Sequence, residues 1–196
     1  MLNPAKPIDL ADAVGVEGDK HWYVAIVRHG DERRCGVQLT SYGYENFIPV
    51  QRVARRYPDG RKKKVEKLVL PSRVFVRATE FVRLKYIVNF PVVLRFMVDR
   101  ARRKSSDSAS PVAIVPDAEL QLFRRMLNQG SHPVRFVDHD HLFAAGDKVR
   151  VVSGSLAGLE GFVGETEGSK GRLYVQMDFL GVAVVEINKE LLEQIY

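Results

Sequence analysis

The sequence lacks the features that would indicate a disulfide scaffold or a membrane protein. Cys35 is its single cysteine, so no internal disulfide can form, and this cysteine usage predicts a reducing, cytoplasmic environment. The longest apolar run, residues 86–98, is interrupted by Asn89, Pro91 and Arg95, which excludes a membrane-spanning helix of about 20 residues. The acidic first 19 residues do not resemble a signal peptide. We expect Cys35 to be a small buried side chain and not a nucleophile.

Patterns for catalysis and for metal binding are also missing. The sequence shows no nucleophile with a plausible base and no glycine-rich phosphate loop. The segment 131–143 is rich in His and Asp, but it has no pair of ligands at helical spacing and no nearby cysteine. We interpret this segment as a solvated linker between domains. We therefore expect no metal, no cofactor and no enzymatic activity.

Positive charge is concentrated in the first part of the chain. Residues 1–110 contain 22 Lys and Arg against 12 Asp and Glu, whereas residues 144–196 contain 5 against 8. A basic first half joined to a mildly acidic C-terminal part favours a polyanion as the partner of the first half. An ordinary solvated basic surface is the alternative interpretation, and charge alone does not distinguish the two.

Periodicity predicts an α+β domain that begins after a poorly ordered arm, residues 1–19. Residues 21–27 are apolar on both faces, as in a central strand. Asp31 is placed to cap a helix with Cys35, Leu39 and Tyr42 on one stripe, ending near Gly43. Residues 52–57 and 61–67 flank a Pro-Asp-Gly turn and predict a hairpin. The basic residues of this hairpin cannot be buried, so the hairpin should project into solvent, and nucleic acid is the ligand that it would face if it faces any. These basic residues are Arg52, Arg55, Arg56, Arg61, Lys62, Lys63 and Lys64.

The alternation continues through the middle of the chain. Residues 68–78 predict a strand with Val74 and Val76 on one face and Phe75 and Arg77 on the other. Thr79 then opens a helix, for which we expect an apolar stripe made by Phe81, Leu84 and either Ile87 or Val88. The domain continues with a strand at 92–98 and a mobile loop at 99–110. It ends with a helix after Pro116 that has Leu120, Phe123 and Leu127 on its inner side. The element order predicts a mainly antiparallel sheet.

The C-terminal part has the glycine spacing of a small β-barrel. Residues 146–163 read GDKVRVVSGSLAGLEGFV, where Gly158 and Gly161 predict positive φ or close backbone approach. This stretch resembles a KOW motif, the signature of a small SH3-like barrel. Alternating strands at 172–179 and 182–187, with residues 191–195 closing it, fit a KOW domain over 144–196.

Taken together, the motifs resemble the NusG family of transcription factors over nearly the whole chain. Trp22-Tyr23 opens the first strand, Leu70-Pro71 leads into residues 74–76, and Ile114-Val115-Pro116 precedes the third helix. The resemblance implies an N-terminal NusG-type (NGN) domain at 20–130, the linker at 131–143 and the KOW domain. The strings HWYVAIVRH, FIPVQ, RKKKVEKLVLP and FMVDRARRK look most like UpxY-type antiterminators of capsular polysaccharide operons.

The resemblance also implies partners and site residues. In the family, an apolar patch binds the clamp helices of RNA polymerase. The positions that match it here are Leu70, Pro71 and Phe75, with Ile26 and Phe96 as weaker candidates. Ser72-Arg73 replaces the usual Gly-aromatic pair, which removes a ring from the patch. Burial of Phe75 in the domain's own core is an equally weighted alternative.

Two further sites follow from the same resemblance. Specialised members read the non-template DNA strand through basic residues in and after the first loop, a region occupied here by Arg28, His29, Arg33 and Arg34. Nascent RNA is a second candidate ligand. The family barrel recruits a small-subunit ribosomal protein or Rho through a loop that matches Phe179 and Leu180.

The functional hypothesis is a non-enzymatic, monomeric elongation factor that promotes readthrough of a long operon. A general NusG that couples polymerase to Rho or to the ribosome is the first alternative. A KOW-type RNA-binding protein is the second, and the acidic barrel is evidence against it.

Overall fold

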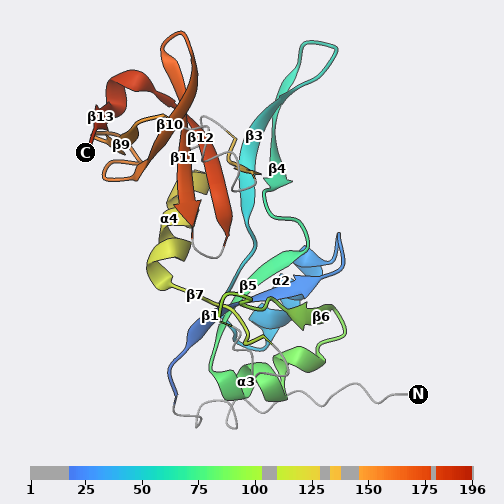
Figure 1. Ribbon diagram of the computed structural model, residues 1–196. Helices are drawn as coiled ribbons and strands as arrows, with labels where there is room; N and C mark the ends of the chain where they lie inside the picture. Colours follow the sequence, from blue (N-terminus) through green and yellow to red (C-terminus); the bar gives the residue numbers. More distant parts are fainter. Residues whose placement is uncertain (1–17, 103–109, 129–132, 138–145, 178–179, 196) are drawn as a thin grey trace. The chain divides into compact units, whose positions relative to one another are not determined.

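The computed structural model describes residues 18–102, 110–128, 133–137, 146–177 and 180–195 (Figure 1). The predicted arm at 1–19 therefore lies almost entirely outside the described residues, as does most of the predicted loop at 99–110. The chain forms two compact units, and neither is one continuous stretch of sequence. The first unit contains residues 1–48 and 70–117, and the second contains residues 49–69 and 118–196.

The first unit is an antiparallel sheet with helices, as the periodicity predicts. Its strand order is β2-β5-β1-β6, and β7 also pairs with β1. The strands are β1 (His21–Val27), β2 (Asn46–Phe47), β5 (Arg73–Ala78), β6 (Val93–Phe96) and β7 (Ile114–Val115). The helices are α2 (Glu32–Ser41), α3 (Glu80–Lys85) and the 3₁₀ turn η1 (Ile87–Asn89).

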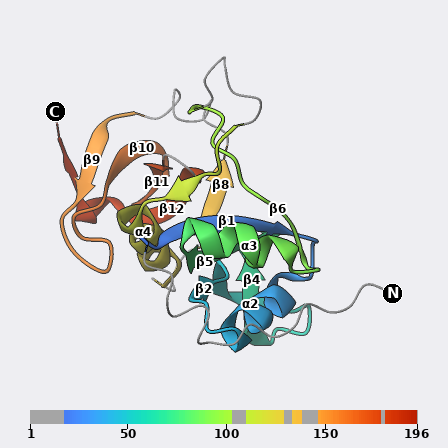
Figure 2. The same ribbon diagram turned by 90° about the horizontal axis from the view of Figure 1, so that it is seen from below.

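The core of this unit lies between one face of the sheet and its helices. Alternate residues of β1 and β5 pack with side chains from α2, α3 and η1, and Figure 2 shows both α-helices beside these strands. The cluster includes Tyr23, Ala25, Val27, Val74, Val76, Cys35, Leu39, Val82, Ile87 and Phe96. Burial raises the pKa of the Cys35 thiol to about 11, so this cysteine is an inert core residue, as predicted.

The opposite face of the sheet is also closely packed. Val24 lies opposite Phe75 in the β1–β5 register, and both side chains are fully buried. The Phe75 ring centroid lies 5.7 Å from that of Phe47. Burial on both faces of β1 confirms that residues 21–27 form a central strand, and it confirms the predicted alternation of Val74 and Val76 with Phe75.

The predicted inner stripe of the helix after Thr79 is wrong for Phe81 and Leu84 and right for Ile87, which is fully buried. Phe81 and Leu84 are 45% and 55% exposed, whereas Val82 and Arg83 are buried. Thr79 caps this short helix by accepting a hydrogen bond from the Val82 backbone N–H at 3.3 Å. The hydrophobicity pattern failed here because a charged residue turns inward, where its charge is paired.

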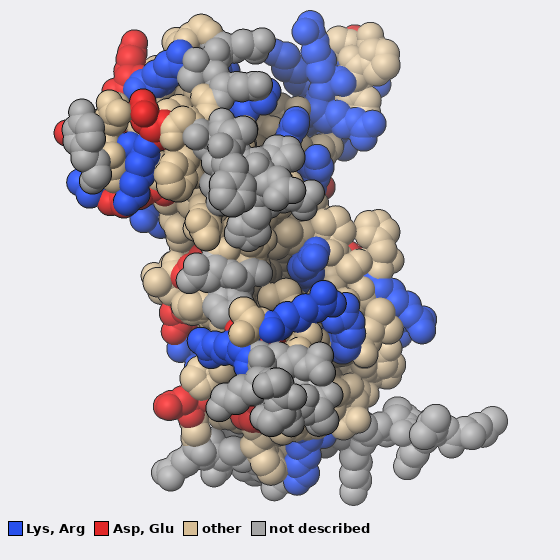
Figure 3. Space-filling model, viewed as in Figure 1, with Lys and Arg blue, Asp and Glu red and all other residues tan. Residues whose placement is uncertain are grey.

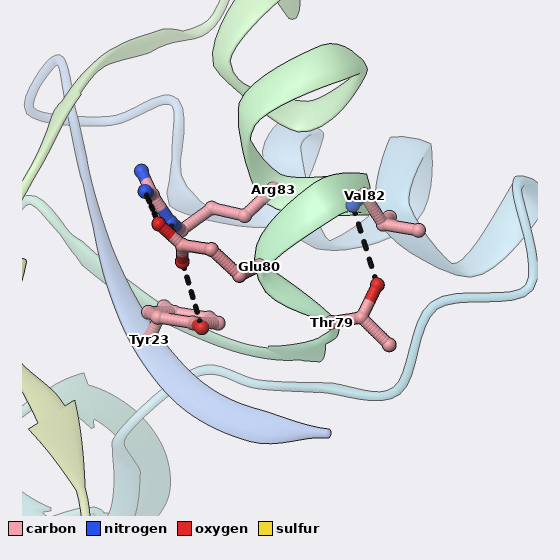
Figure 4. Close-up of polar contacts among 5 residues, drawn as sticks. All are labelled: Tyr23, Thr79, Glu80, Val82 and Arg83. Atoms are coloured by element: carbon pink, nitrogen blue, oxygen red, sulfur yellow. Dashed lines mark hydrogen bonds and ion pairs between the residues drawn. The ribbon is translucent and has the colours of Figure 1, made fainter. Parts of the chain in front are cut away.

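That inward residue, Arg83, belongs to a polar cluster on the core side of the sheet (Figure 4). Its guanidinium forms two hydrogen bonds to the Glu80 carboxylate, and the Tyr23 hydroxyl donates to Glu80 Oε2 at 2.9 Å. Arg83 Cζ also lies 5.2 Å from the Tyr23 ring centroid and 5.1 Å from that of Phe96. Burial and the bond to Glu80 raise the pKa of Tyr23 to about 12.

The second unit contains the predicted hairpin, a helix and the C-terminal strands. The hairpin consists of β3 (Val50–Arg56) and β4 (Lys62–Leu68), which form a two-stranded sheet of their own. Helix α4 (Asp117–Asn128) buries Leu120, Phe123 and Leu127, as predicted. Near its end, Arg125 Nη2 donates to the Ser155 and Ala157 carbonyls at 3.3 and 2.9 Å.

The C-terminal strands form one antiparallel sheet with the order β13-β9-β10-β11-β12-β8. This arrangement is consistent with a KOW or SH3-like domain, although no pairing between described residues closes it into a barrel. Within the segment that we interpreted as a linker, residues 135–137 form a strand. The strands are β8 (Arg135–Val137), β9 (Lys148–Val151), β10 (Glu160–Glu167), β11 (Lys170–Met177), β12 (Gly181–Asn188) and β13 (Leu192–Gln194).

Two glycines of the KOW stretch have the roles that their spacing predicts. Gly158 has φ +83°, in the left-handed region. At Gly161, an added Cβ would overlap the Tyr174 carbonyl oxygen of the paired strand β11.

We expect Gly161→Ala to lower the free energy of unfolding by about 2 kcal/mol, because two paired backbones would have to separate. Gly18→Ala is the control, since a Cβ there meets only ordinary contacts with Thr79. Chemical denaturation of both variants tests this, and equal stability of the two would contradict the assigned role of Gly161.

No helix in the described part of the chain is long and apolar enough to cross a membrane. Within the same residues, no group of three or more His, Cys, Asp or Glu side chains is placed to hold a metal ion. Most of the His- and Asp-rich segment at 131–143, including both of its Asp residues, lies outside the described residues.

Candidate functional site

Two loops of the first unit are joined by one buried carboxylate, Glu32. Its Oε2 accepts a hydrogen bond from the Gly30 N–H at 2.9 Å, and its Oε1 accepts one from the Ser72 N–H at 2.7 Å. The backbone adds a third link, because the Val27 N–H donates to the Ser72 carbonyl at 3.0 Å. Glu32 therefore ties the loop after β1 to the turn before β5.

The environment of Glu32 keeps it ionised. Only 1% of the residue is exposed, and this desolvation by itself would raise its pKa. The hydrogen bonds from backbone N–H groups, including those of Ser72 and Gly30, outweigh desolvation and lower the pKa below its ordinary value. The charge of Glu32 is thus stabilised by the loops that it holds.

The predicted side-chain cap of α2 is wrong. Asp31 occupies the N-cap position of α2, but its side chain makes no capping hydrogen bond. Glu32, which was not among the predicted functional residues, bonds to both loops instead. An acidic residue in the first turn of a helix was the available signal, but its second partner, Ser72, is 40 residues away.

The turn held by Glu32 has an unusual backbone conformation. Ser72 has φ +62°, and it is the one non-glycine residue with positive φ in the described chain. A side chain in this conformation costs about 1–2 kcal/mol. The two backbone hydrogen bonds of Ser72, to Glu32 and from Val27, hold it there.

The four basic residues predicted to contact nucleic acid lie together at this loop. Arg28 and His29 are in the loop after β1, and Arg33 and Arg34 are in the first turn of α2. All four are exposed. His29 Nδ1 lies 3.9 Å from Glu32 Oε1, and 77% of its side chain is accessible to solvent. The structure thus brings these four basic residues together, accessible to solvent, on the loop after β1 and the first turn of α2, where Glu32 holds the loop in place.

The predicted polymerase patch is brought together only in part. Ile26 is half-buried and shares a face of the sheet with Phe75, and Arg73 lies opposite Ile26 in the register. Leu70 is buried and Pro71 is exposed, and both immediately precede the turn at Ser72.

Phe96 lies apart from these residues. It pairs with Ala25 and packs in the helix-covered core on the other face of the sheet, with its ring centroid 6.1 Å from that of Tyr23. In the C-terminal sheet, Leu180 is half-buried just before Gly181, and Phe179 lies outside the described residues.

The fold places this chain among NusG-like proteins. A solved structure described as "Domain interaction in Thermotoga maritima NusG" matches it with a TM-score of 0.54 and 19% sequence identity, over 91% of this chain and 98% of the other. At that identity, the likeness establishes the fold alone.

Sequence comparison establishes the family. Residues 20–124, more than half of the chain, match the family described as "Transcription termination factor nusG", and the chain belongs to the NusG family. It is 27% identical to the transcription termination/antitermination protein NusG of Pasteurella multocida, over 84% of this chain and 88% of that protein. It is 26% identical to the NusG of Haemophilus influenzae, over 90% of this chain and 95% of that protein.

Family membership defines the general activity. NusG-family proteins are transcription factors and not enzymes, and they bind RNA polymerase. This protein is accordingly a transcription termination/antitermination factor of the NusG type.

Proposed function

We propose that this NusG-family protein is a specialised antiterminator that binds RNA polymerase and promotes readthrough of a long operon, of the polysaccharide-biosynthesis class. The observation that carries the proposal is the Glu32 anchor, which holds the basic loop and the turn after Leu70-Pro71 as one piece. A loop fixed in this way can present cations to nucleic acid while the neighbouring turn contacts polymerase. In this proposal, residues 20–130 are the polymerase-binding domain, 131–143 the linker and 144–196 the KOW domain.

The polymerase contact is proposed for the sheet face that carries Ile26 and Phe75, together with Leu70 and Pro71. Pro71 and Ile26 are the accessible members of this set. Leu70 and Phe75 are buried in this structure, where they lie beneath the proposed contact surface and support its shape. Phe96 supports the same sheet from its opposite face. The proposed partner surface is the clamp helices of the polymerase.

The nucleic-acid contact is proposed for Arg28, His29, Arg33 and Arg34, with the non-template DNA strand or nascent RNA as ligand. Phosphate contacts from arginine give affinity, and one or two base contacts give specificity. These side chains leave the domain from two adjacent segments, so they can follow a short length of single strand.

The KOW domain is proposed to contact a small-subunit ribosomal protein or Rho through Phe179 and Leu180. A general NusG that couples polymerase to Rho remains the second candidate function, supported by the relatives named above as termination/antitermination proteins. The two candidates differ in their response to Rho, because a coupling factor enhances Rho-dependent termination and an antiterminator opposes it.

A single-round transcription assay tests the proposal with the wild type and with Arg28→Ala/Arg34→Ala. The wild type should raise readthrough on its own operon leader and not on an unrelated one, with or without Rho. The double variant should bind the paused complex about tenfold more weakly, and its log–log salt slope should be smaller by about 1.4, which corresponds to two lost phosphate contacts to a single strand.

Lys20→Ala/Lys170→Ala is the matched control, because it removes two exposed charges from elsewhere on the chain. Recruitment of the Arg28/Arg34 variant at the wild-type level would overturn the nucleic-acid assignment. Enhanced termination with Rho would replace the antiterminator with the coupling factor.

A further inference from the structure

One hairpin of this protein has a positive excess as large as the net charge of the whole chain. Residues 50–68, which form β3, β4 and their turn, contain eight Lys and Arg against two Asp and Glu. The complete chain contains 30 against 24, so 22 of each sign remain outside the hairpin. The hairpin by itself has a net charge of +6, equal to that of the whole chain, and its Lys and Arg side chains gather at the upper right of Figure 3.

The strand register places like charges directly opposite each other near the tip. Arg55 pairs with Lys63, and Arg56 pairs with Lys62. Like charges in directly opposed positions destabilise a hairpin. Because side chains alternate along a strand, one of these pairs lies on each face, so both faces are basic. A bound polyanion would relieve this repulsion.

The two acidic residues of the hairpin already have partners. Glu66 Oε1 lies 3.5 Å from Arg52 Nε. Asp59 accepts hydrogen bonds from the Arg61 N–H at 3.0 Å and from its Nε at 2.6 Å, and this bonding lowers the pKa of Asp59. Within the described chain, Lys62, Lys63 and Lys64 have no carboxylate within ion-pair distance. Their charges are available to a ligand.

An aromatic ring lies among these cations. Tyr57, Arg61, Lys62 and Lys63 line a hollow of about 360 Å³, a size typical of small-molecule sites. Arg55 Cζ lies 5.3 Å from the Tyr57 ring centroid, which orients the ring through a cation–π contact. The Tyr57 backbone N–H also donates to the Arg61 carbonyl at 2.9 Å, which holds the main chain that carries the ring at the start of the turn.

We propose that the tip of this hairpin is a second nucleic-acid site, which binds a single strand by stacking a base on Tyr57 and pairing its phosphates with Lys62 and Lys63. A basic groove combined with an aromatic platform is how proteins bind single strands without reading their sequence. A duplex keeps its bases stacked on each other, and an acidic protein surface has no base to stack. The hollow beside Tyr57 therefore favours a single strand over both.

Charge removal at the tip provides the first test, using fluorescence anisotropy of the full chain with dT12 and rU12. Lys62→Gln/Lys63→Gln should reduce affinity about tenfold and lower the log–log salt slope by about 1.4. The matched control Lys20→Gln/Lys170→Gln should change both values by much less. Equal effects of the two double variants would overturn the site. Comparison of dT12 with rU12 identifies whether DNA or RNA is the better ligand.

Ring removal provides the second test. Tyr57→Leu should weaken dT12 binding by about tenfold and leave binding of an abasic 12-mer unchanged, whereas Tyr57→Phe should keep wild-type affinity for both. Equal losses on the two strands, or tighter binding to duplex than to dT12, would overturn base stacking. Tyr57→Leu should have the same effect when it is added to the Arg28→Ala/Arg34→Ala variant. The result for this site is therefore independent of the nucleic-acid site in the proposed function.

Discussion

Replacing Glu32 with alanine should lower the free energy of unfolding by about 3 kcal/mol, because it leaves the N–H groups of Gly30 and Ser72 without their acceptor. Ser72 should suffer most, since its positive φ is held by few contacts. Glu32→Gln should be intermediate, because one amide oxygen can accept from only one of the two loops at the present geometry. Urea denaturation of both variants measures these effects.

The dependence on pH distinguishes a charged anchor from simple packing. The folded-state pKa of Glu32 is lowered, so its stabilising contribution is complete above the ordinary value of 4.5 and is lost as pH falls through the lower folded value. The stability difference between wild type and Glu32→Gln should therefore shrink below pH 4.5.

The control for this pH effect is Glu45→Gln. Glu45 has a surface pairing with Arg77 at 3.5 Å, which should contribute less than 1 kcal/mol. A Glu32→Gln difference that is constant from pH 7 to pH 3 would contradict the role of its charge.

The second large effect should be an asymmetry between Glu80 and Arg83. Arg83 is 5% exposed, whereas 57% of the Glu80 side chain is accessible to solvent. Glu80→Ala should cost about 3 kcal/mol because it leaves a buried guanidinium without its carboxylate. Arg83→Met should cost about 1–2 kcal/mol, because water hydrates the remaining Glu80 and methionine keeps apolar contact with the Tyr23 and Phe96 rings.

The double variant provides the decisive comparison. Glu80→Ala/Arg83→Met should be more stable than Glu80→Ala alone, since the unpaired charge is then gone. A double variant with the sum of both losses would contradict this account. Tyr23 gives a further readout. Because its pKa is raised in the folded state, its protonated hydroxyl contributes stability that is complete below pH 10 and is lost as pH rises toward about 12. Loss of its hydrogen bond to Glu80 should bring the folded-state pKa of Tyr23 closer to 10, so the pH range over which stability falls should become narrower.

Local sequence signals predicted most of the elements correctly. The hairpin around Pro58-Asp59-Gly60, the positions of α2 and α4, and the role of Gly158 depend on neighbouring residues. For these, a short window of sequence contains the determining interactions. The inner side of α3 was predicted wrongly because its burial depends on an ion pair, and hydrophobicity does not report a paired charge.

The residues of the candidate site could be predicted from the sequence, but their arrangement in space could not. The basic loop residues and the Leu70-Pro71 pair could be found by resemblance to the NusG family. Phe96 was assigned to the same patch as Phe75, yet the register places it on the opposite face of the sheet. Sequence periodicity gives the faces within one strand, but the relation between faces of different strands is set by their pairing.

By itself, the sequence determined the family, the order of strands and helices, and the accumulation of cations between residues 50 and 68, because motifs, periodicity and charge are local properties. Only the tertiary structure decided that Glu32 bonds to a turn 40 residues away, that the buried Arg83 packs against two rings, and that like charges oppose each other across the hairpin. Each of these depends on which distant atoms come within hydrogen-bonding or packing distance. That proximity is created by chain folding and has no signature in the order of the residues.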